Sequence, residues 1–398
     1  MSAVTSLATG ERARPATVLP RPELDSPPPT PRLSIGSRPA QDTFVVWGSR
    51  VAALAMAWLI CERLLPLHGI VWYVVVAAVC NVVVLALATL VTDTAVEVSD
   101  RVVQWLVSAA AIVVFGSLLS TVVYVVKRGW PALHHLNFFT DTMAGISATT
   151  PLDQGGILHT IVGSLIELGI AVVITLPLGI GTAVFMNEIG GRFARLVRTV
   201  VEAMTALPDI LAGLFIYTVW ILALGQPRSG LAAGFALAVM MLPIIARTAD
   251  VVLRVVPGSL REASLALGAS RWKTVWHVVL PTARPGLATA LILGIARGIG
   301  ETAPVMIVSG NANFMVTDPV HGGVMSSLPL FIFTQARSGL DLAVDRAFGT
   351  ATVLLLLVLV LFVLARVVAR PPSPDGGLIV RARRGLRSLL NRSRKAVS

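Results

Sequence analysis

Long runs of apolar residues alternate with short polar segments over most of this chain. A helix that crosses a bilayer needs about 20 mainly apolar residues, within a range of roughly 17–25. The fold class that we expect is therefore all-α, a polytopic helical membrane protein. The pattern predicts eight spans, at 45–61, 70–91, 102–126, 160–185, 200–224, 231–246, 287–308 and 347–368. The first span is the weakest, because it is short and contains Arg50, whose side chain must reach toward the interface.

The two ends of the chain are polar. Residues 1–43 contain five arginines and a cluster of prolines, a composition that cannot bury a core, so we expect a disordered tail. Residues 369–398 form a basic tail that suits anionic membrane lipids. The loops predicted inside carry more Lys and Arg than the loops predicted outside, which places both termini in the cytoplasm. The loop 92–101 fits this assignment poorly, because it is mainly acidic.

Composition supports a membrane protein and narrows the function. Only 13% of the residues are charged, against about a quarter in soluble domains, and the mean hydropathy is +0.80. The net charge of +11 lies in the tails and loops, so we expect no nucleic-acid partner. Cys61 and Cys80 lack metal-ligand spacing, so we expect no disulfide framework and no metal site. No P-loop sequence occurs, so we expect neither catalysis nor a cofactor in this chain.

The polar-edged segment 247–286 lies between two predicted spans. Its spacing predicts a first helix over 253–267 that ends at Gly268, a residue type that favours helix C-termini. Ser270 is expected to cap a second helix, over 271–280, which Pro281 then breaks. Small residues on the first helix would allow a close approach to another protein. From the residues alone, a docking element and a plain interfacial hairpin are both open.

Two ionisable residues, Arg297 and Glu301, fall inside the predicted span 287–308. A charge at bilayer depth costs at least about 2.5–3.5 kcal/mol, so such residues usually face a cavity or a partner. Their spacing places them on one helix face. The paired N–H donors of an arginine suit phosphate or another oxyanion. Glu301 would hold the arginine side chain or accept a hydrogen bond from a protonated oxygen of the substrate. A purely structural ion pair is the alternative. A ridge of small residues suited to close helix packing accompanies the pair: Ala290, Gly294 and Gly298.

The segment 247–286 resembles the coupling loop, or EAA loop, of ABC importer permeases. Two departures are mild, since Ser264 replaces a second Ala and Val278 replaces an Ile. In that family the loop docks on the ATPase subunit. The resemblance implies that five residues form the ATPase-coupling element: Glu262, Ala263, Gly268, Leu280 and Pro281.

The run from Ala296 to Pro304 resembles the next-to-last span of PstA-type phosphate permeases. The resemblance covers about residues 102–368, a six-span permease core, and leaves two additional spans in 44–101. It implies that Arg297 and Glu301 line the substrate path. The chain departs from the family at three acids, Glu167, Glu202 and Asp209, where the family is mostly apolar or small, with Ser common at the last position.

The resemblance also implies partners and a location. A second permease subunit (PstC-like), two ATPase subunits (PstB-like) that bind ATP and Mg, and an extracytoplasmic phosphate-binding protein (PstS-like) would complete an importer in the bacterial cell membrane. Three other functions are open. They are an ABC permease for molybdate, tungstate or sulfate, an ion-coupled secondary transporter, and a membrane sensor that transports nothing.

Overall fold

The computed structural model describes residues 40–65, 69–92 and 95–368. The predicted tails, residues 1–43 and 369–398, lie outside these ranges, except that helix α1 begins at Ala40 and so includes the last four residues of the first tail. The chain divides into two compact units, residues 1–115 and 116–398. Each unit is described by itself below.

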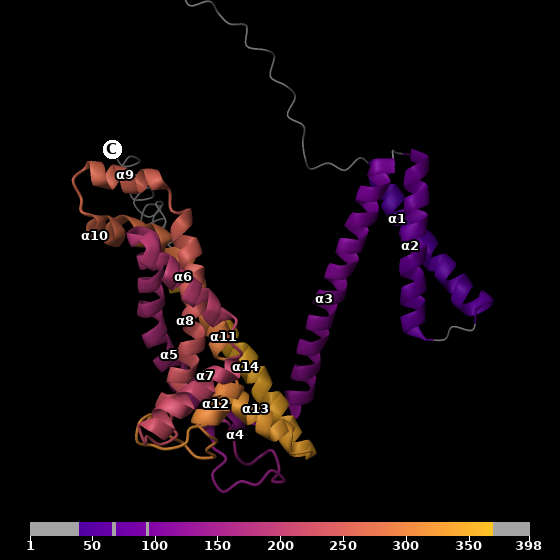
Figure 1. The fold of residues 1–398 in the computed structure, drawn as a ribbon. Coiled ribbons are helices and arrows are strands. Elements are labelled where there is room, and N and C mark those ends of the chain that lie inside the picture. Colours follow the sequence, from indigo (N-terminus) through magenta and orange to yellow (C-terminus); the bar gives the residue numbers. More distant parts are fainter. Residues whose placement is uncertain (1–39, 66–68, 93–94, 369–398) are drawn as a thin grey trace, which may run out of the picture. The chain divides into compact units, whose positions relative to one another are not determined.

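The first unit contains a pair of packed apolar helices. They are α1 (Ala40–Leu59), continued by the π-helical turn η1 (Ile60–Leu64), and α2 (Ile70–Thr92); α3 (Ala95–Leu133) begins in this unit (Figure 1). Small side chains, Ala53 and Ala57, are buried on α1, and Cys80 and Leu85 are buried on α2. The Tyr73 hydroxyl donates a hydrogen bond to the Leu54 carbonyl at 3.2 Å. Both helices have the length and composition of membrane spans.

The second unit is a helical bundle around α8. Its helices after α3 are α4 (Asn137–Thr140), α5 (Leu158–Val184), α6 (Gly191–Thr205), α7 (Asp209–Ile216), α8 (Gly230–Val255), α9 (Gly258–Ala266), α10 (Arg271–Thr274), α11 (Leu280–Gly298), α12 (Ala303–Val308), α13 (Leu328–Ala336) and α14 (Asp341–Val368). Three π-helical turns continue α5, α7 and α10: η2 (Phe185–Ile189), η3 (Tyr217–Ala223) and η4 (Val275–Val279).

The centre of this bundle is α8, the most buried of the candidate spans. Its sequence is rich in small and apolar residues on all sides, as expected for a helix surrounded by others. The predicted small-residue ridge of α11 packs here. A Cβ added at Gly294 would lie 2.7 Å from Ile245, and one added at Gly298 would lie 2.5 Å from Met241. The ridge therefore sets how closely α11 approaches α8.

Seven helices in the described part of the chain are long and apolar enough to cross a membrane, and one bent pair could form an eighth span. The bent pair corrects the predicted straight span 200–224. Helix α6 ends at Thr205, and α7 begins at Asp209 after a bend of 103°. Pro208 explains the break, because the residue before a proline is disfavoured in helical conformation.

The predicted span 287–308 is also interrupted. Helix α11 ends at Gly298, and α12 begins at Ala303 with Pro304 in its first turn, where a missing N–H costs nothing. Glu301 lies in the short break between them. The prediction that Arg297 and Glu301 share one helix face is therefore wrong.

The segment 247–286 differs from its prediction at the first helix. That helix does not run from 253, because α8 ends at Val255 and Pro257 separates it from α9. Gly268 follows the end of α9 with φ +82°, which confirms its predicted terminating role. The Ser270 hydroxyl accepts a hydrogen bond from the Lys273 backbone N–H at 3.4 Å, which confirms the predicted cap.

Pro281 does not break the second helix, contrary to prediction. The chain is helical from Arg271 to Gly298, through α10, η4 and α11, and forms one candidate span. Pro281 lies in the first turn of α11, directly after the π-helical turn, where its missing N–H is tolerated.

An irregular cap covers one end of the bundle. It includes the segments 141–157 and 309–327, with α4 and α13 beside them (Figure 1). Arg346 of α14 is 1% exposed, and its Nη2 donates to the backbone carbonyls of Thr150 and Pro151, both at 2.9 Å. This buried arginine fastens the cap to α14.

Candidate functional site

Arg297, in the last turn of α11, has two carboxylate partners from different elements. Its Nη2 pairs with Asp209, the first residue of α7, and its Nε lies 3.2 Å from the Glu301 carboxylate. The exposed fractions of these side chains are 49% for Arg297, 31% for Asp209 and 16% for Glu301. The break after Gly298 places Glu301 beside Arg297, and the α6–α7 bend brings Asp209 to it.

These charges border a hollow of about 530 Å³ between the α6–α7 bend, α8 and α11. Arg297 and Asp209 are its only charged lining residues among those described. The other lining residues are mainly apolar and include Leu211 and Phe215 of α7 and Met240 of α8. A guanidinium edge with an apolar surround strengthens electrostatic contact with an anion, because little water screens it. The arrangement therefore fits a site that an oxyanion can enter.

A second polar layer lies behind Glu301. Glu301, Glu167, Ser164 and Ser327 line the same small space. Glu167, on α5, is only 1% exposed, and its carboxylate is 2.9 Å from the Ser309 hydroxyl. The Ser164 hydroxyl accepts a hydrogen bond from the Leu328 backbone N–H at 2.7 Å. Glu167 therefore links α5 to the segment between α12 and α13.

Of the three acids that depart from the family, two belong to these layers. Asp209 pairs with Arg297, and Glu167 lies behind Glu301. Glu202, on α6, is exposed and outside both spaces. The sequence marked Asp209 as unusual, but it did not reveal its partner, because the two residues are 88 positions apart.

The predicted coupling residues divide into two groups. Glu262, Ala263 and Gly268 are exposed on and after α9, and Leu267 beside them is 89% exposed. Leu280 and Pro281 are half-buried at the start of α11. A hydrogen bond of 2.9 Å between the hydroxyls of Ser264 and Thr274 joins α9 to α10. The structure thus makes α9 the projecting part and the 280–281 pair its base.

Sequence reasoning missed the residue that holds α9 in place, Arg261. Its Nε lies 3.0 Å from the carboxylate of Glu188, which is in η2, the turn that continues α5. Its Nη1 and Nη2 donate to the carbonyls of Val256 and Leu253, at 2.8 and 2.9 Å. These carbonyls end α8, where no intrahelical donor is available. Arg261 therefore connects α9 to η2, at the end of α5, and to α8.

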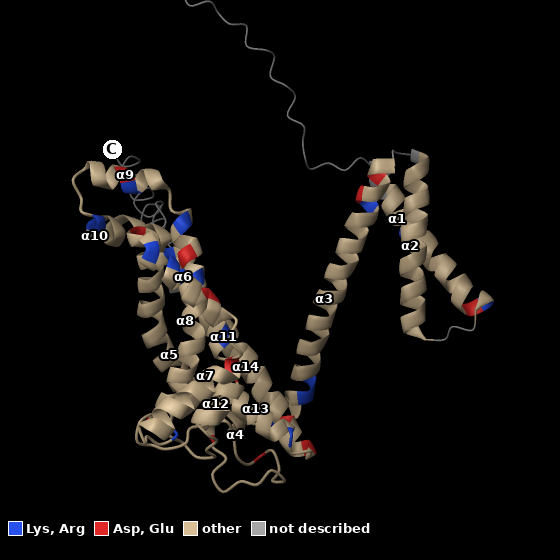
Figure 2. Ribbon diagram, viewed as in Figure 1, with Lys and Arg blue, Asp and Glu red and all other residues tan. Residues whose placement is uncertain are grey.

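A related cluster lies one turn deeper and was also missed. Asp250 of α8 is 5% exposed and accepts hydrogen bonds from Asn187 at 2.7 Å, Arg198 at 3.2 Å and Arg254 at 2.5 Å. Figure 2 shows charged residues gathered at this end of the second unit, around α6, α9 and α10. An acid within a mostly apolar helix is a signal visible in the sequence, but the partners of that acid are not.

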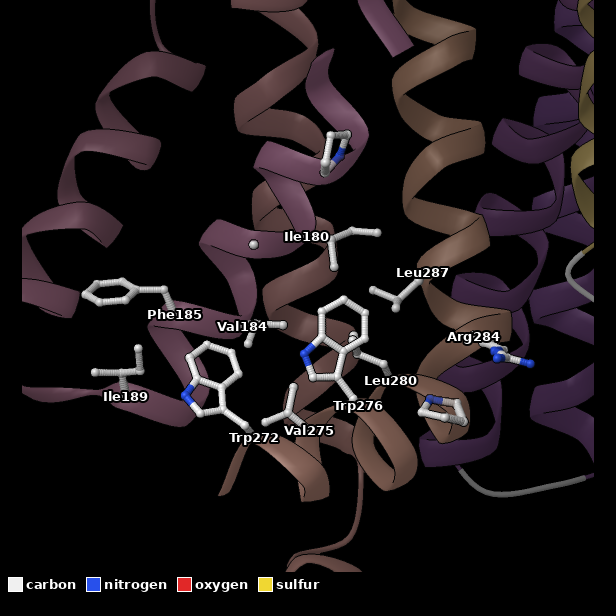
Figure 3. Close-up of a pocket in the computed structure, with 13 residues that line it drawn as sticks. Ile180, Val184, Phe185, Ile189, Trp272, Val275, Trp276, Leu280, Arg284 and Leu287 are labelled. Atoms are coloured by element: carbon white, nitrogen blue, oxygen red, sulfur yellow. The ribbon is translucent and has the colours of Figure 1, made fainter. Parts of the chain in front are cut away.

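A larger hollow than that at Arg297 lies elsewhere in the second unit and has a different character. It is a groove of about 670 Å³ between α5 and the start of α11, lined by Trp272, Trp276 and aliphatic side chains (Figure 3). Arg284 is its only charged lining residue among those described. A groove so apolar is unsuited to an anion, whereas the Arg297 hollow has a guanidinium at its edge.

The second unit combines a helical bundle with a bent span, a charged hollow and a projecting loop. This combination is typical of a polytopic transport protein. A family model described as "Binding-protein-dependent transport system inner membrane component" matches residues 175–370. The chain is 38% identical over 235 residues to "Phosphate transport system permease protein PstA 1" of Mycobacterium tuberculosis (strain ATCC 25618 / H37Rv), covering 59% of this chain and 75% of that protein. It is 32% identical over 245 residues to the PstA permease of Pasteurella multocida (strain Pm70), covering 61% and 84%.

Among solved structures, the chain is similar to an inward-facing MetNI methionine ABC transporter. The TM-score is 0.44 and the identity is 22%, covering 54% of this chain and 93% of that one. On the sequence relationships, this chain belongs to the family of PstA-type permeases of ABC importers, which confirms the resemblance carried by its motifs.

Proposed function

We propose that this chain is a transmembrane permease subunit of an ATP-driven importer and that its substrate is inorganic phosphate. The observation that carries the proposal is Arg297, a guanidinium between two carboxylates at the edge of an apolar hollow. The names of the relatives, phosphate transport system permeases, support the choice of substrate.

Arg297 and Glu301 are the substrate-path residues in this proposal. The guanidinium binds phosphate through a planar pair of N–H donors, which match two phosphate oxygens. Glu301 holds the side chain in place when the site is empty and accepts a hydrogen bond from a protonated substrate oxygen. Sulfate and molybdate carry no such proton at neutral pH, so the carboxylate disfavours them.

The chain itself catalyses nothing in this proposal. Two PstB-like ATPase subunits bind ATP and Mg, a PstC-like permease completes the path, and a PstS-like binding protein delivers phosphate from outside. Both termini lie in the cytoplasm, and α9 then projects toward the ATPase subunits. Its exposed face, with Glu262, Ala263 and Leu267, suits a protein contact. Arg261 passes the movement of α9 to α5 and α8.

The test is uptake of radiolabelled phosphate in cells that lack this chain and are complemented by wild type or by Arg297→Gln. We expect wild type to restore uptake and Arg297→Gln to lower the uptake rate roughly tenfold to a hundredfold. This factor corresponds to the loss of a charge-assisted hydrogen bond. Arg63→Gln, an exposed arginine of the first unit, is the matched control and should behave as wild type.

Two results would contradict the proposal. Equal uptake by wild type and Arg297→Gln, at equal membrane levels, would make Arg297 structural. An assembled complex that carries no phosphate would point to another oxyanion, because an Arg fork binds sulfate, molybdate or tungstate through the same contacts. Competition by these anions in the uptake assay tests the alternative oxyanions. Collapse of the ion gradient in cells that still contain ATP tests an ion-coupled transporter, because its uptake would then stop.

A further inference from the structure

The Arg297 site contains more negative than positive charge. Asp209 and Glu301 both pair with the single guanidinium of Arg297, so the three groups together carry a formal charge of minus one when all are ionised. A path built only to attract anions would not place a second carboxylate on its arginine, because like charges at this distance repel. The excess charge must therefore affect which anions are accepted.

The geometry leaves one edge of the guanidinium free. Glu301 occupies Nε and Asp209 occupies Nη2, while Nη1 has no hydrogen-bond partner among the described residues. Nη1 and the second hydrogen of Nη2 form the remaining donor pair. An oxyanion bound there shares Nη2 with Asp209, so one of its oxygens lies close to the Asp209 carboxylate.

An unprotonated substrate oxygen beside the Asp209 carboxylate is repelled by its charge, whereas a protonated oxygen donates a hydrogen bond to it. An ionised carboxylate has no proton to give, so the substrate must supply it. Among the described elements around α7, Glu301 on the Nε of the same guanidinium is the one other titratable group that acts on Asp209, and its carboxylate adds to the negative charge there. Helix α12 has no titratable side chain, the hollow's α8 lining is apolar, Tyr217 of η3 faces Arg228, and Glu202 of α6 is exposed outside the hollow.

We propose that Asp209 is a specificity-determining residue that restricts this site to singly charged, proton-bearing oxyanions, dihydrogen phosphate in particular. The inference rests on the proposed function and adds the ionic form of the substrate to it. Asp209 accepts a hydrogen bond from a protonated substrate oxygen, while Arg297 neutralises the single charge. The doubly charged form adds a second negative charge to a site that already carries more negative than positive charge.

The test compares Asp209→Asn with wild type in the complete importer, with its ATPase subunits and binding protein, reconstituted in liposomes. Phosphate uptake is measured at saturating substrate across the second ionisation of phosphate, from mildly acidic to mildly alkaline external pH. The binding protein and ATPase are the same in both samples, so the ratio of variant to wild-type rate isolates the permease.

We expect this ratio to rise with pH. Asparagine keeps the size of the side chain, removes one negative charge and offers an N–H to an unprotonated substrate oxygen. The pH optimum should move upward by roughly one unit, the effect of a neighbouring charge on a titrating group. Asp341→Asn is the matched control, because Asp341 is a 95% exposed carboxylate paired with Arg128, and its ratio should stay constant.

A constant ratio for Asp209→Asn would overturn the inference, because a structural Asp209 would change the rate equally at every pH. Asp209→Ser provides a second variant with a short polar side chain at the start of α7. Failure of both variants to assemble would also overturn it, since a specificity residue must be replaceable without loss of the fold. Wild-type complex that carries no phosphate would instead reject the proposed function.

Discussion

At the scale of single residues, several arginine side chains connect one element of the second unit to another. Arg346 binds backbone carbonyls of the cap, Arg261 binds the carbonyls that end α8, and Arg297 joins α11 to α7. A planar guanidinium with five donors can satisfy several acceptors at once, which a lysine cannot. Arg346 and Arg261 have backbone carbonyls as partners, while Arg297 is half-exposed and binds only carboxylates. This difference separates the structural arginines from the candidate transport residue.

Close helix contacts also depend on single residues. A Cβ at Gly129 of α3 would lie 2.6 Å from the backbone of Gly349 on α14, so Gly129→Ala must push the two helices apart. We expect a loss of about 1–3 kcal/mol, measured as a lower melting temperature of the purified complex. Gly169→Ala on α5 is the control, because a Cβ there meets nothing within 4 Å. Equal melting temperatures for both variants would contradict this prediction.

At the scale of elements, breaks in helices create the site. The α6–α7 bend presents Asp209, and the break between α11 and α12 presents Glu301. Unpaired backbone groups are tolerated at bilayer depth only where they face protein or a polar cavity. Both breaks meet at Arg297, so the irregular backbone and the charged hollow are parts of one arrangement.

The element that we propose to carry coupling is α9, and Arg261 connects it to Glu188 and to the end of α8. We expect Arg261→Gln to lower phosphate uptake per ATP hydrolysed, because α9 loses its ion pair with Glu188 and a donor to the end of α8. The measurement is simultaneous uptake and ATPase activity in proteoliposomes. Arg192→Gln, an exposed residue of α6, should leave the ratio at the wild-type value. An unchanged ratio in Arg261→Gln would show that α9 is held by other contacts.

At the scale of the whole molecule, every residue of the proposed site and coupling element lies in the second unit. The family match, residues 175–370, also falls there. The first unit contributes two candidate spans before α3. The division of the chain at 101/102 between additional spans and permease core remains a prediction, and so does the function of the additional spans.

We expect a chain that begins at Ala95, after a start methionine, to assemble and to restore phosphate uptake. Removing both α1 and α2 takes away an even number of spans, so the orientation of the remaining spans is preserved. Deletion of residues 1–69, which removes α1 alone, is the contrasting variant and should reduce assembly. Normal membrane levels of the shorter chain without uptake would show that the first unit takes part in transport.

The membrane class, the approximate positions of most spans, the projecting loop and the occurrence of an arginine and a glutamate between apolar segments all follow from the sequence. These features depend on local hydropathy and on short motifs, which are properties of neighbouring residues. Gly268 and Ser270 were predicted correctly for the same reason, since helix termini are decided within one turn.

The contacts of those charged residues depend on how the helices pack. Hydropathy cannot distinguish a straight span from one bent at Pro208, nor show that Pro281 continues a helix after a π-helical turn. Asp209 reaches Arg297, and Glu188 reaches Arg261, over 88 and 73 positions of sequence. Such pairs form because the packing of α8 against α5 and α11 brings distant segments together, and that packing depends on the whole bundle.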